Sequence, residues 1–415
     1  MDARHAAATL IDAVLRGRRA LDASLAALPA MEARDRGFAH MLAATVLRRL
    51  GTLDAILDQC LSRAPPDAVR DVIRIGAAQL LFLGTAPHAA VDSAVTQARA
   101  IGGQAFGGLT NAVLRRIARD GAALREGLDE ARLDTPDWLW AAWWGAYGPA
   151  TYDIALAHRM EAPLDLSLRP GAAPPPGSTL LPTGTARLPS GTRVPDLPGF
   201  AEGAFWVQDA AASLPAQLLA ARPGEHVLDL CAAPGGKTAQ LAATRARVTA
   251  VESDAARLPR LRENLTRLHL QVETIHADAT KWRPSALVDA VLLDAPCTAT
   301  GTIRRHPDVA HIKRARDVTN MVAAQDALLD AAAAMLRPGG RLVFAVCSLQ
   351  PEEGFARVLA ATQRLALRHD PFTPAELAML PEALDAQGCL RTLPSMLGEQ
   401  GGMDGFFAAR LLRPA

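Results

Sequence analysis

Hydrophobic positions recur at helical spacing through about the first 130 residues. The clearest series lie within residues 10–28, 42–57 and 69–81, where leucine, valine and isoleucine return every three or four positions. Such spacing is typical of amphipathic helices that bury one face. Proline and glycine clusters separate the series, at 65–66, 84–87 and 102–108. The pattern therefore predicts an all-helical domain over residues 1–130.

The pattern changes between residues 131 and 205. Tryptophan and tyrosine crowd residues 138–147, and residues 164–169 alternate in polarity like a strand. A stretch rich in proline, glycine, serine and threonine follows at 170–198. These features predict a connecting segment or small α+β subdomain over 131–205.

From residue 206 onward, apolar runs alternate with helical stretches. Five short runs lie at 227–230, 248–251, 272–275, 290–293 and 342–346. This alternation predicts an α/β domain over 206–415, with a mostly parallel sheet and helices on both faces. Ligands of such sheets bind beyond the carboxyl ends of the strands. After each run comes one polar or sulfur-bearing residue that could take part in a functional site. These residues are Cys231, Glu252, Asp278, Asp294 and Cys347.

Composition adds few further constraints. A chain of 415 residues is expected to form two or three domains, and 50% hydrophobic with 21% charged residues is ordinary for a globular protein. No apolar run reaches 18 residues, and the N-terminus lacks a signal-peptide pattern, so we expect a cytoplasmic protein without membrane contact. The net charge of +1 neither favours nor excludes a nucleic-acid partner. Five cysteines without CxxC or zinc spacing predict neither a disulfide framework nor a metal site.

The first apolar run of this domain leads into the loop CAAPGGKT, residues 231–238. Its two glycines allow a ligand to approach the backbone, and a helix is expected to follow. The loop matches neither the GxGxxG motif of dinucleotide-binding enzymes nor the GxxxxGK(S/T) motif of phosphate-binding loops. Glu252, about 20 residues later, could accept the hydroxyls of a ribose, and Asp278 could accept an exocyclic amine of adenine. Each acid taken alone would be interpreted as an ordinary surface carboxylate. Together with the loop, the two acids indicate a site that binds a nucleotide.

Two cysteines follow apolar runs in LLDAPCTATG (292–301) and AVCSLQPEEG (345–354). Either Cys297 or Cys347 could be a nucleophile, although a buried cysteine is often only a small packing residue. The residues alone do not decide between the two thiols.

Basic residues cluster in two places where RNA could bind. Arg115 and Arg116 lie on one face of a predicted helix, and Arg304, Arg305 and His306 follow the Cys297 loop closely. These groups could contact phosphates, while the alternative for both is an ordinary solvated surface.

Four motifs together resemble the RsmB (Fmu) type of 16S ribosomal RNA cytosine-C5 methyltransferases. They are DLCAAPGGKT, LLDAPCTATGTIRRHPD, AVCSLQPEE and DGFFAARL, which span the last 210 or so residues. The first 130 residues, with NAVLRR, resemble the NusB-like RNA-binding domain found in front of that catalytic domain. The resemblance implies a Rossmann-like fold that binds S-adenosylmethionine, releases S-adenosylhomocysteine, and acts as a monomer on 16S rRNA or an assembling small subunit.

The resemblance also implies roles for individual residues. Glu252 would bind the ribose of the cofactor, Asp278 the adenine, and Asp294 both the cofactor site and the target base. Cys347 would be the nucleophile, and Cys297 would assist release of the product. The methionine portion of the cofactor would be held by the loop residues Cys231, Ala232, Ala233, Pro234, Gly235, Gly236 and Lys237.

Three positions depart from the family pattern. Glu252 stands where the family usually has aspartate, Val346 replaces the threonine of a TCS motif, and Gly354 replaces the asparagine of a PEEN motif. None of these changes removes a principal catalytic group, so we expect activity.

The chemistry explains why such residues are needed. A thiolate that adds to C6 of cytosine makes C5 nucleophilic, and N3 must then receive a proton or a strong hydrogen bond. Asp294 is the candidate for that contact. The base must also leave its stack, so a splayed or flipped cytosine is expected. The alternatives are a non-catalytic RNA-binding or ribosome-assembly factor with the same fold, and a methyltransferase of transfer RNA.

Overall fold

The computed structural model describes residues 2–415, which divide into two compact units. A helical unit comprises Met1–Met160 with Ile303–Arg314, and an α/β unit comprises Glu161–Thr302 with Ala315–Ala415. The two units are described separately below. Among the described residues, no helix is long and apolar enough to cross a membrane.

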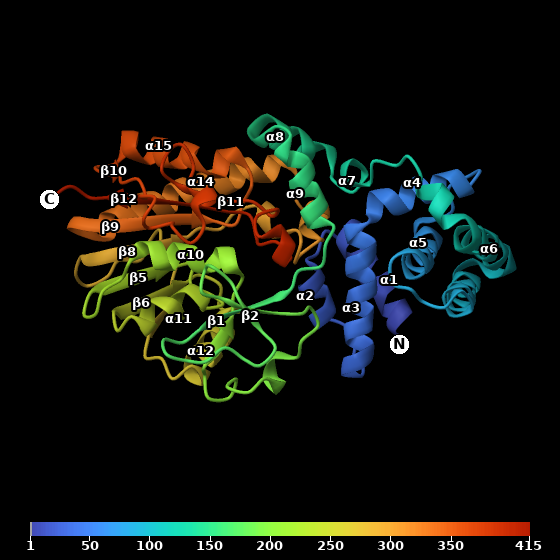
Figure 1. The fold of residues 1–415 in the computed structure, drawn as a ribbon, viewed down its shortest axis with the longest axis horizontal. Coiled ribbons are helices and arrows are strands. Elements are labelled where there is room, and N and C mark those ends of the chain that lie inside the picture. The colour runs from blue at the N-terminus through green and yellow to red at the C-terminus, as the bar shows by residue number, and fades with distance from the viewer. Residues whose placement is uncertain (1) are drawn as a thin grey trace. The chain divides into compact units, whose positions relative to one another are not determined.

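The N-terminal part of the chain is helical, as predicted. In the longest helix, α6, Gly102 and Gly103 leave helical geometry, and Gly103 has a φ of +78°, which glycine adopts without strain. The two glycines therefore divide α6 into two pieces, where the sequence pattern also predicts a break. The helices are α1 (Ala3–Leu15), α2 (Leu21–Ala26), α3 (Ala33–Arg48), α4 (Leu50–Cys60), α5 (Asp67–Leu81), α6 (Pro87–Arg125), α7 (Glu130–Leu133), α8 (Asp137–Tyr147) and α9 (Ala150–His158) (Figure 1).

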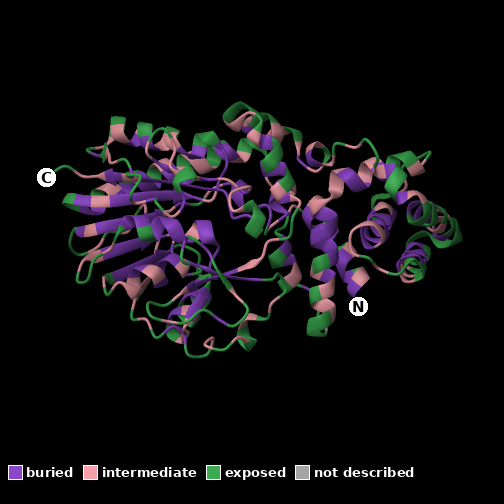
Figure 2. Ribbon diagram, viewed as in Figure 1, coloured by how far each residue is buried: buried purple, intermediate pink, exposed green. Residues whose placement is uncertain are grey.

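The core of the helical unit is made by the series of apolar residues seen in the sequence. Leu10, Leu42, Leu53 and Ile73 are fully buried, one from each of α1, α3, α4 and α5. On α1 and α4 the buried residues recur on one face, whereas residues 42–47 of α3 and 71–79 of α5 are buried without interruption, and Figure 2 shows buried residues on the helices of this unit. Tertiary burial of this kind supplies most of the stability of such helices.

A short segment from the C-terminal half of the chain belongs to the helical unit. Residues 303–314, which include α13 (Val309–Ile312), follow directly after the Cys297 loop. The Asp308 carboxylate accepts a hydrogen bond from the backbone N–H of Leu21 at 2.9 Å, and His311 Nε2 lies 2.8 Å from the carbonyl oxygen of Leu47. The expected domains at 1–130, 131–205 and 206–415 stay a prediction. The two compact units have different boundaries from these domains, because α7–α9 and residues 303–314 pack with the first helices.

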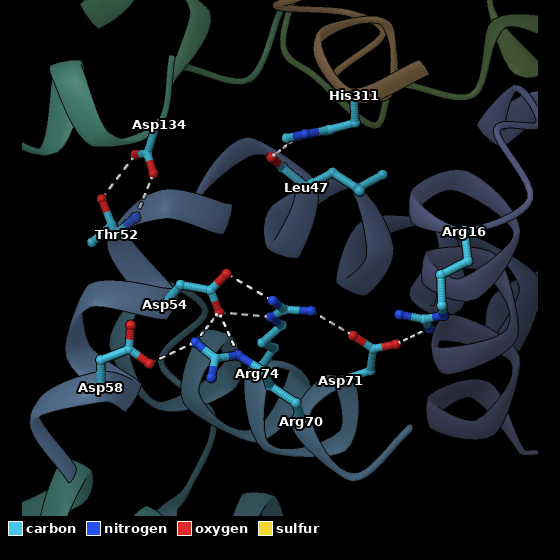
Figure 3. A network of polar contacts seen from close by, with 10 residues as sticks. All are labelled: Arg16, Leu47, Thr52, Asp54, Asp58, Arg70, Asp71, Arg74, Asp134 and His311. Carbon is cyan, nitrogen blue, oxygen red and sulfur yellow. Dashed lines mark hydrogen bonds and ion pairs between the residues drawn. The ribbon is translucent and has the colours of Figure 1, made fainter. Parts of the chain in front are cut away.

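Charged side chains form a network inside the helical unit (Figure 3). Arg74 pairs with Asp71 and with Asp54, each at 2.7 Å, and Arg16 also pairs with Asp71. The side chain of Asp71 is 2% exposed, whereas that of Asp58, which pairs with Arg70 at the edge of the network, is 66% exposed. The buried Asp71 thus joins α5 to Arg16 at the end of α1, and Asp54 on α4 joins the same network through Arg70 and Arg74.

The α/β unit begins with a small antiparallel sheet and continues into a larger one. The small sheet has the order β2-β3-β1-β4, and the larger sheet has the order β10-β12-β9-β8-β5-β6-β7, with β11 paired to β12. The strands of the small sheet are β1 (Leu164–Leu168), β2 (Thr179–Leu180), β3 (Ala186–Leu188) and β4 (Phe205–Val207). Those of the larger sheet are β5 (His226–Leu230), β6 (Arg247–Glu252), β7 (Glu273–His276), β8 (Val288–Asp294), β9 (Leu336–Val346), β10 (Arg368–His369), β11 (Leu390–Thr392) and β12 (Phe406–Leu412).

The five strands from β9 to β7 run parallel, and β12 pairs with β9 antiparallel. Helices cover both faces, as predicted. One face packs Leu228, Val291 and Phe344 against α14 and α15, while the other packs Val227 and Leu292 against α10 and α11. These helices are α10 (Ala210–Leu219), α11 (Gly236–Ala243), α14 (Ala315–Met335) and α15 (Phe355–Arg364), and α12 (Leu258–Arg267) packs near β6.

We expect Asp71→Ala to destabilise the helical unit by about 3 kcal/mol, because the buried Arg74 and the partly buried Arg16 each lose a charged partner. The measurement is hydrogen exchange of the α5 amides, which reports the free energy of opening locally. Asp58→Ala is the matched control and should cost less than about 1 kcal/mol, since its carboxylate is largely exposed. Equal effects of the two substitutions would contradict this interpretation of the network.

Candidate active site

The candidate residues from the sequence meet at one edge of the larger sheet. Cys231, Glu252, Asp278, Asp294 and Cys347 lie at or just after the carboxyl ends of β5, β6, β7, β8 and β9. These strands are parallel neighbours in the order β9-β8-β5-β6-β7, so Cys347 and Asp294 lie on one side of the β5 loop. Glu252 and Asp278, the two acids expected to bind a nucleotide, lie on the other side.

The loop after β5 has the backbone geometry expected of a close-approach loop. Gly235 has a φ of +101°, and a Cβ added there would lie 2.6 Å from the Leu261 side chain, so any other residue would be strained and would displace that side chain. Glu252 is 2% exposed and holds this loop. One carboxylate oxygen accepts a hydrogen bond from the backbone N–H of Ala233 at 3.1 Å, and the other accepts one from Asp254 at 2.9 Å.

A cavity of about 200 Å³ opens beyond the ends of β5, β6 and β7. Its wall includes Cys231 and Asp278, Pro296 from the thiol loop, and Leu328 from α14. Of the seven expected loop residues, Cys231 belongs to this wall in the described chain, and the other six do not. The apolar walls with one carboxylate fit a planar base that offers an amine, which is the chemistry expected of adenosine.

Asp278 is well suited to accept a hydrogen bond in that cavity. One of its oxygens accepts hydrogen bonds from the backbone N–H and the hydroxyl of Thr280, at 2.9 and 2.6 Å. These bonds lower the pKa of the Asp278 carboxyl below its usual value. The group therefore stays ionised. Its second oxygen lies 3.5 Å from Nζ of Lys281, whose side chain is 85% exposed, and a ligand N–H could also bind to it.

Asp294 connects the loop to the thiol side of the site. Its Oδ2 lies 2.8 Å from Nζ of Lys237, and that ammonium group lies 4.9 Å from the centre of the Phe406 ring. The Lys237 side chain is 10% exposed, whereas that of Asp294 is 31% exposed. The carboxylate is thus paired on one side and open on the other, where a base could bind.

Asp229 is a buried acid that the sequence pattern did not single out. It lies within β5, accepts a hydrogen bond from the Thr238 hydroxyl on Oδ2, and has no partner for Oδ1 in the described structure. Burial raises the pKa of Asp229 to about 7, with a further increase from the charges of Asp294 and Glu252. The available signal was a carboxylate inside an otherwise apolar strand, two positions before CAAPGGKT.

The two candidate thiols are neighbours. Sγ of Cys297 lies 3.5 Å from Sγ of Cys347, and the backbone N–H of Gly301 donates a hydrogen bond to the carbonyl oxygen of Cys347 at 3.1 Å. The hydrogen bond to Cys347, together with burial, raises the pKa of the Cys297 thiol well above its usual value. Cys297 therefore keeps its proton and can donate it to the sulfur of Cys347.

The predicted RNA-contacting residues divide into two groups. Arg115 and Arg116 are exposed on α6, Arg305 is exposed, and His306 is partly exposed with Nδ1 3.6 Å from Asp22. Arg304, by contrast, is 2% exposed. Burial, with a smaller contribution from the Arg304 charge, lowers the pKa of His158 to about 3. A guanidinium enclosed in this way is not placed to bind a phosphate, so the expectation for Arg304 does not agree with the structure.

Two family models match separate parts of the chain. Residues 216–412 match the model described as 16S rRNA methyltransferase RsmB/F, and residues 1–119 match the NusB family. These ranges correspond to most of the α/β unit and to the first helices.

Curated relatives align with nearly the whole chain. The ribosomal RNA small subunit methyltransferase B of Pseudomonas putida is 37% identical and is aligned over 100% of this chain and 99% of its own length. The corresponding protein of Vibrio cholerae is also 37% identical and is aligned over 99% of this chain and 97% of its own length. Among solved structures, one titled PH0851 has a TM-score of 0.74 at 22% identity and covers 98% of each chain. A methyltransferase homologue from Pyrococcus horikoshii has a TM-score of 0.54 at 25% identity and covers 71% of this chain and 98% of its own.

The raised pKa of Asp229 leads to a prediction about stability and pH. Between about pH 4 and pH 7 the unfolded chain loses this proton while the folded chain keeps it, so the folded state loses stability as pH rises. Asp229→Asn removes this titration. We expect urea unfolding of the α/β unit to show the variant gaining stability relative to the wild type from pH 4.5 to pH 7.5. Parallel pH profiles for the two proteins would contradict the assignment.

Proposed function

Because the chain belongs to the 16S rRNA methyltransferase RsmB/F family, we propose that it methylates C5 of a cytosine in 16S ribosomal RNA. When bound, S-adenosylmethionine supplies an electrophilic methyl group, and S-adenosylhomocysteine is left as the product. The observation that carries the proposal is the pair of thiols 3.5 Å apart beside a half-open carboxylate, at the edge of a sheet with a nucleoside-sized cavity.

The residues after β5, β6 and β7 bind the cofactor. Asp278 on the cavity wall accepts a hydrogen bond from the amine of the adenine. Glu252, whose oxygens already order the loop, accepts hydrogen bonds from the ribose hydroxyls with its remaining lone pairs. The backbone of residues 231–237 approaches the methionine portion. Glutamate in place of aspartate at 252 is consistent with this role, because the longer side chain still reaches the loop backbone.

Cys347 is the nucleophile. Its sulfur adds to C6 of the cytosine, and the electrons of the C5–C6 double bond move toward N3, which accepts a proton. C5 would then take the methyl group that the cofactor supplies. A base removes the C5 proton, the C5–C6 double bond forms again as the bond from sulfur to C6 breaks, and N3 gives up the proton that it accepted. Asp294, with Lys237 behind it, contacts the N3 edge of the base.

Cys297 assists the last step. Its raised pKa means that it is protonated at neutral pH, so it stabilises the sulfur of Cys347 as a hydrogen-bond donor. A thiol that keeps its proton is a poor nucleophile, so the raised pKa of Cys297 supports the assignment of Cys347 as the attacking group.

The substrate reaches the site as an unpaired or flipped cytosine. Arg115, Arg116 and Arg305 are exposed and can contact phosphates of the same RNA. Phosphate contacts position the RNA, whereas selection of the base depends on Asp294 and the thiol pocket.

The thiol assignment is tested with two variants. We expect Cys347→Ala to abolish methyl transfer from labelled S-adenosylmethionine to deproteinised 16S RNA, because no covalent activation occurs. Cys297→Ala should accumulate a covalent protein–RNA adduct, because attack proceeds while release is slowed. The measurement is 5-methylcytosine in digested RNA, with adducts resolved on denaturing gels.

Cys60→Ala is the matched control, since this thiol lies on α4 in the helical unit. It should leave both readouts at the wild-type level. Adducts formed by Cys347→Ala but not by Cys297→Ala would reverse the assignment. Cofactor binding without transfer to any 16S RNA would favour a non-catalytic assembly factor, and transfer to tRNA alone would place the substrate elsewhere.

A further inference from the structure

A single buried carboxylate lies behind both thiol loops. Glu353 is fully buried and accepts four hydrogen bonds. One oxygen accepts the backbone N–H of Thr298 at 2.9 Å and the side-chain amide of Gln325 at 3.0 Å. The other accepts the hydroxyl of Ser348 at 2.5 Å and the hydroxyl of Thr298.

The donors come from the residues next to the two thiols. Thr298 follows Cys297 directly, and Ser348 follows Cys347 directly. Glu353 therefore holds the Cys297 loop by a backbone and a side-chain bond, and the Cys347 loop by a side-chain bond. The hydroxyls of Thr298 and Ser348 also lie 3.0 Å apart, so the two loops meet at this carboxylate.

Further contacts fix the same junction from other sides. Gln325 on α14 also donates to the carbonyl oxygen of Pro296 at 3.0 Å. Arg391 on β11 donates to the carbonyl oxygen of Ser348 at 2.7 Å. A Cβ added at Gly354 would lie 2.7 Å from Nη2 of Arg391, so the absence of a side chain at 354 leaves room for this guanidinium.

We propose that Glu353 is a positioning residue that sets the separation of the Cys297 and Cys347 sulfurs, and that the division of labour between the thiols depends on it. The role in methyl transfer rests on the function proposed above. Glu353 acts through Thr298 and Ser348. Proton donation from one sulfur to the other is sensitive to the distance between them. If either loop becomes looser, Cys297 no longer assists the release of Cys347 from the base after attack.

Glu353→Gln tests this with little change in volume. The amide replaces one acceptor oxygen with an NH₂ group, which faces donors instead of pairing with them. Thiol proximity is measured without RNA, by equilibrating the full-length protein with reduced and oxidised glutathione. One oxidised glutathione takes up the two thiol hydrogens as two reduced glutathiones, and the sulfurs of Cys297 and Cys347 become a disulfide.

We expect the equilibrium constant for this disulfide, measured by mass-spectrometric mapping of the linked peptides, to fall at least about tenfold in Glu353→Gln. Glu352→Gln is the matched control, because the neighbouring glutamate is exposed. The disulfide equilibrium constant of Glu352→Gln should equal that of the wild type. An equally unchanged constant in Glu353→Gln would overturn the proposal.

Methyl transfer gives the second readout. In Glu353→Gln, kcat should fall at least about tenfold, while the KM values for RNA and cofactor stay within about twofold. A rise in KM for both with unchanged kcat would show a general loss of structure and contradict a positioning role. If the wild type transfers no methyl group to RNA, the proposed function fails, while the glutathione equilibrium still decides whether Glu353 sets the thiol distance.

Thr298→Val and Ser348→Ala cover the case in which Glu353→Gln does not fold. Each removes one hydroxyl donor and leaves the carboxylate in place. Each should lower the disulfide equilibrium constant at least about threefold. Wild-type constants in both variants would overturn the proposal independently of the glutamate substitution.

Discussion

The parallel pairing of β8 with β9 is the constraint on which the chemistry depends. Its register places Asp294 opposite Ala345, so the two chains leave the sheet at the same edge and within a few residues of both thiols. The backbone N–H of Ala295 then donates to the carbonyl oxygen of Ala345 at 2.9 Å and extends the pairing past the strand end. Two cysteines that are 50 residues apart in sequence thus come into sulfur contact. A shift of register by one residue would turn these side chains to the other face of the sheet.

The same sheet places the proposed cofactor site and the proposed thiol site on opposite sides of the β5 loop. On one side of β5, β6 ends in the buried Glu252, and Asp278 after β7 lines a nucleoside-sized cavity. On the other side, β8 ends in Asp294 and β9 ends next to Cys347. The β5 loop lies between the two sides and is tied to both, through Ala233 to Glu252 and through Lys237 to Asp294. A ligand in the cavity and a base at the thiols would therefore contact opposite sides of one ordered loop.

Much of this arrangement could be read from the sequence because it depends on local patterns. The apolar runs predicted the five parallel strands, and the residue after each run predicted one edge of the sheet. Patterns of this kind do not report burial or partners between distant segments. Arg304 was expected at the surface and is enclosed, while Asp229 and Glu353 acquire their significance from residues that are far away or on other loops.

The difference between the two thiols also lies beyond sequence reasoning. Both cysteines follow apolar runs, and the residues alone left them equivalent. The structure adds the surroundings of Cys297: its sulfur lies 3.5 Å from that of Cys347, and this contact, burial and the nearby Glu353 charge raise the pKa of the Cys297 thiol. The groups that cause this shift come from segments far apart in the sequence, so no local pattern could report it.

The central claim is that the sulfur of Cys347 bonds to the target cytosine. The most direct measurement uses 16S RNA that carries 5-fluorocytidine, in which C5 has no proton to lose, so that the covalent complex persists after methyl transfer. Digestion and mass spectrometry then identify the modified peptide. The account predicts a nucleotide attached to Cys347. Attachment to Cys297, or methyl transfer to unmodified RNA with no nucleotide attached to either thiol in the fluorinated RNA, would contradict it.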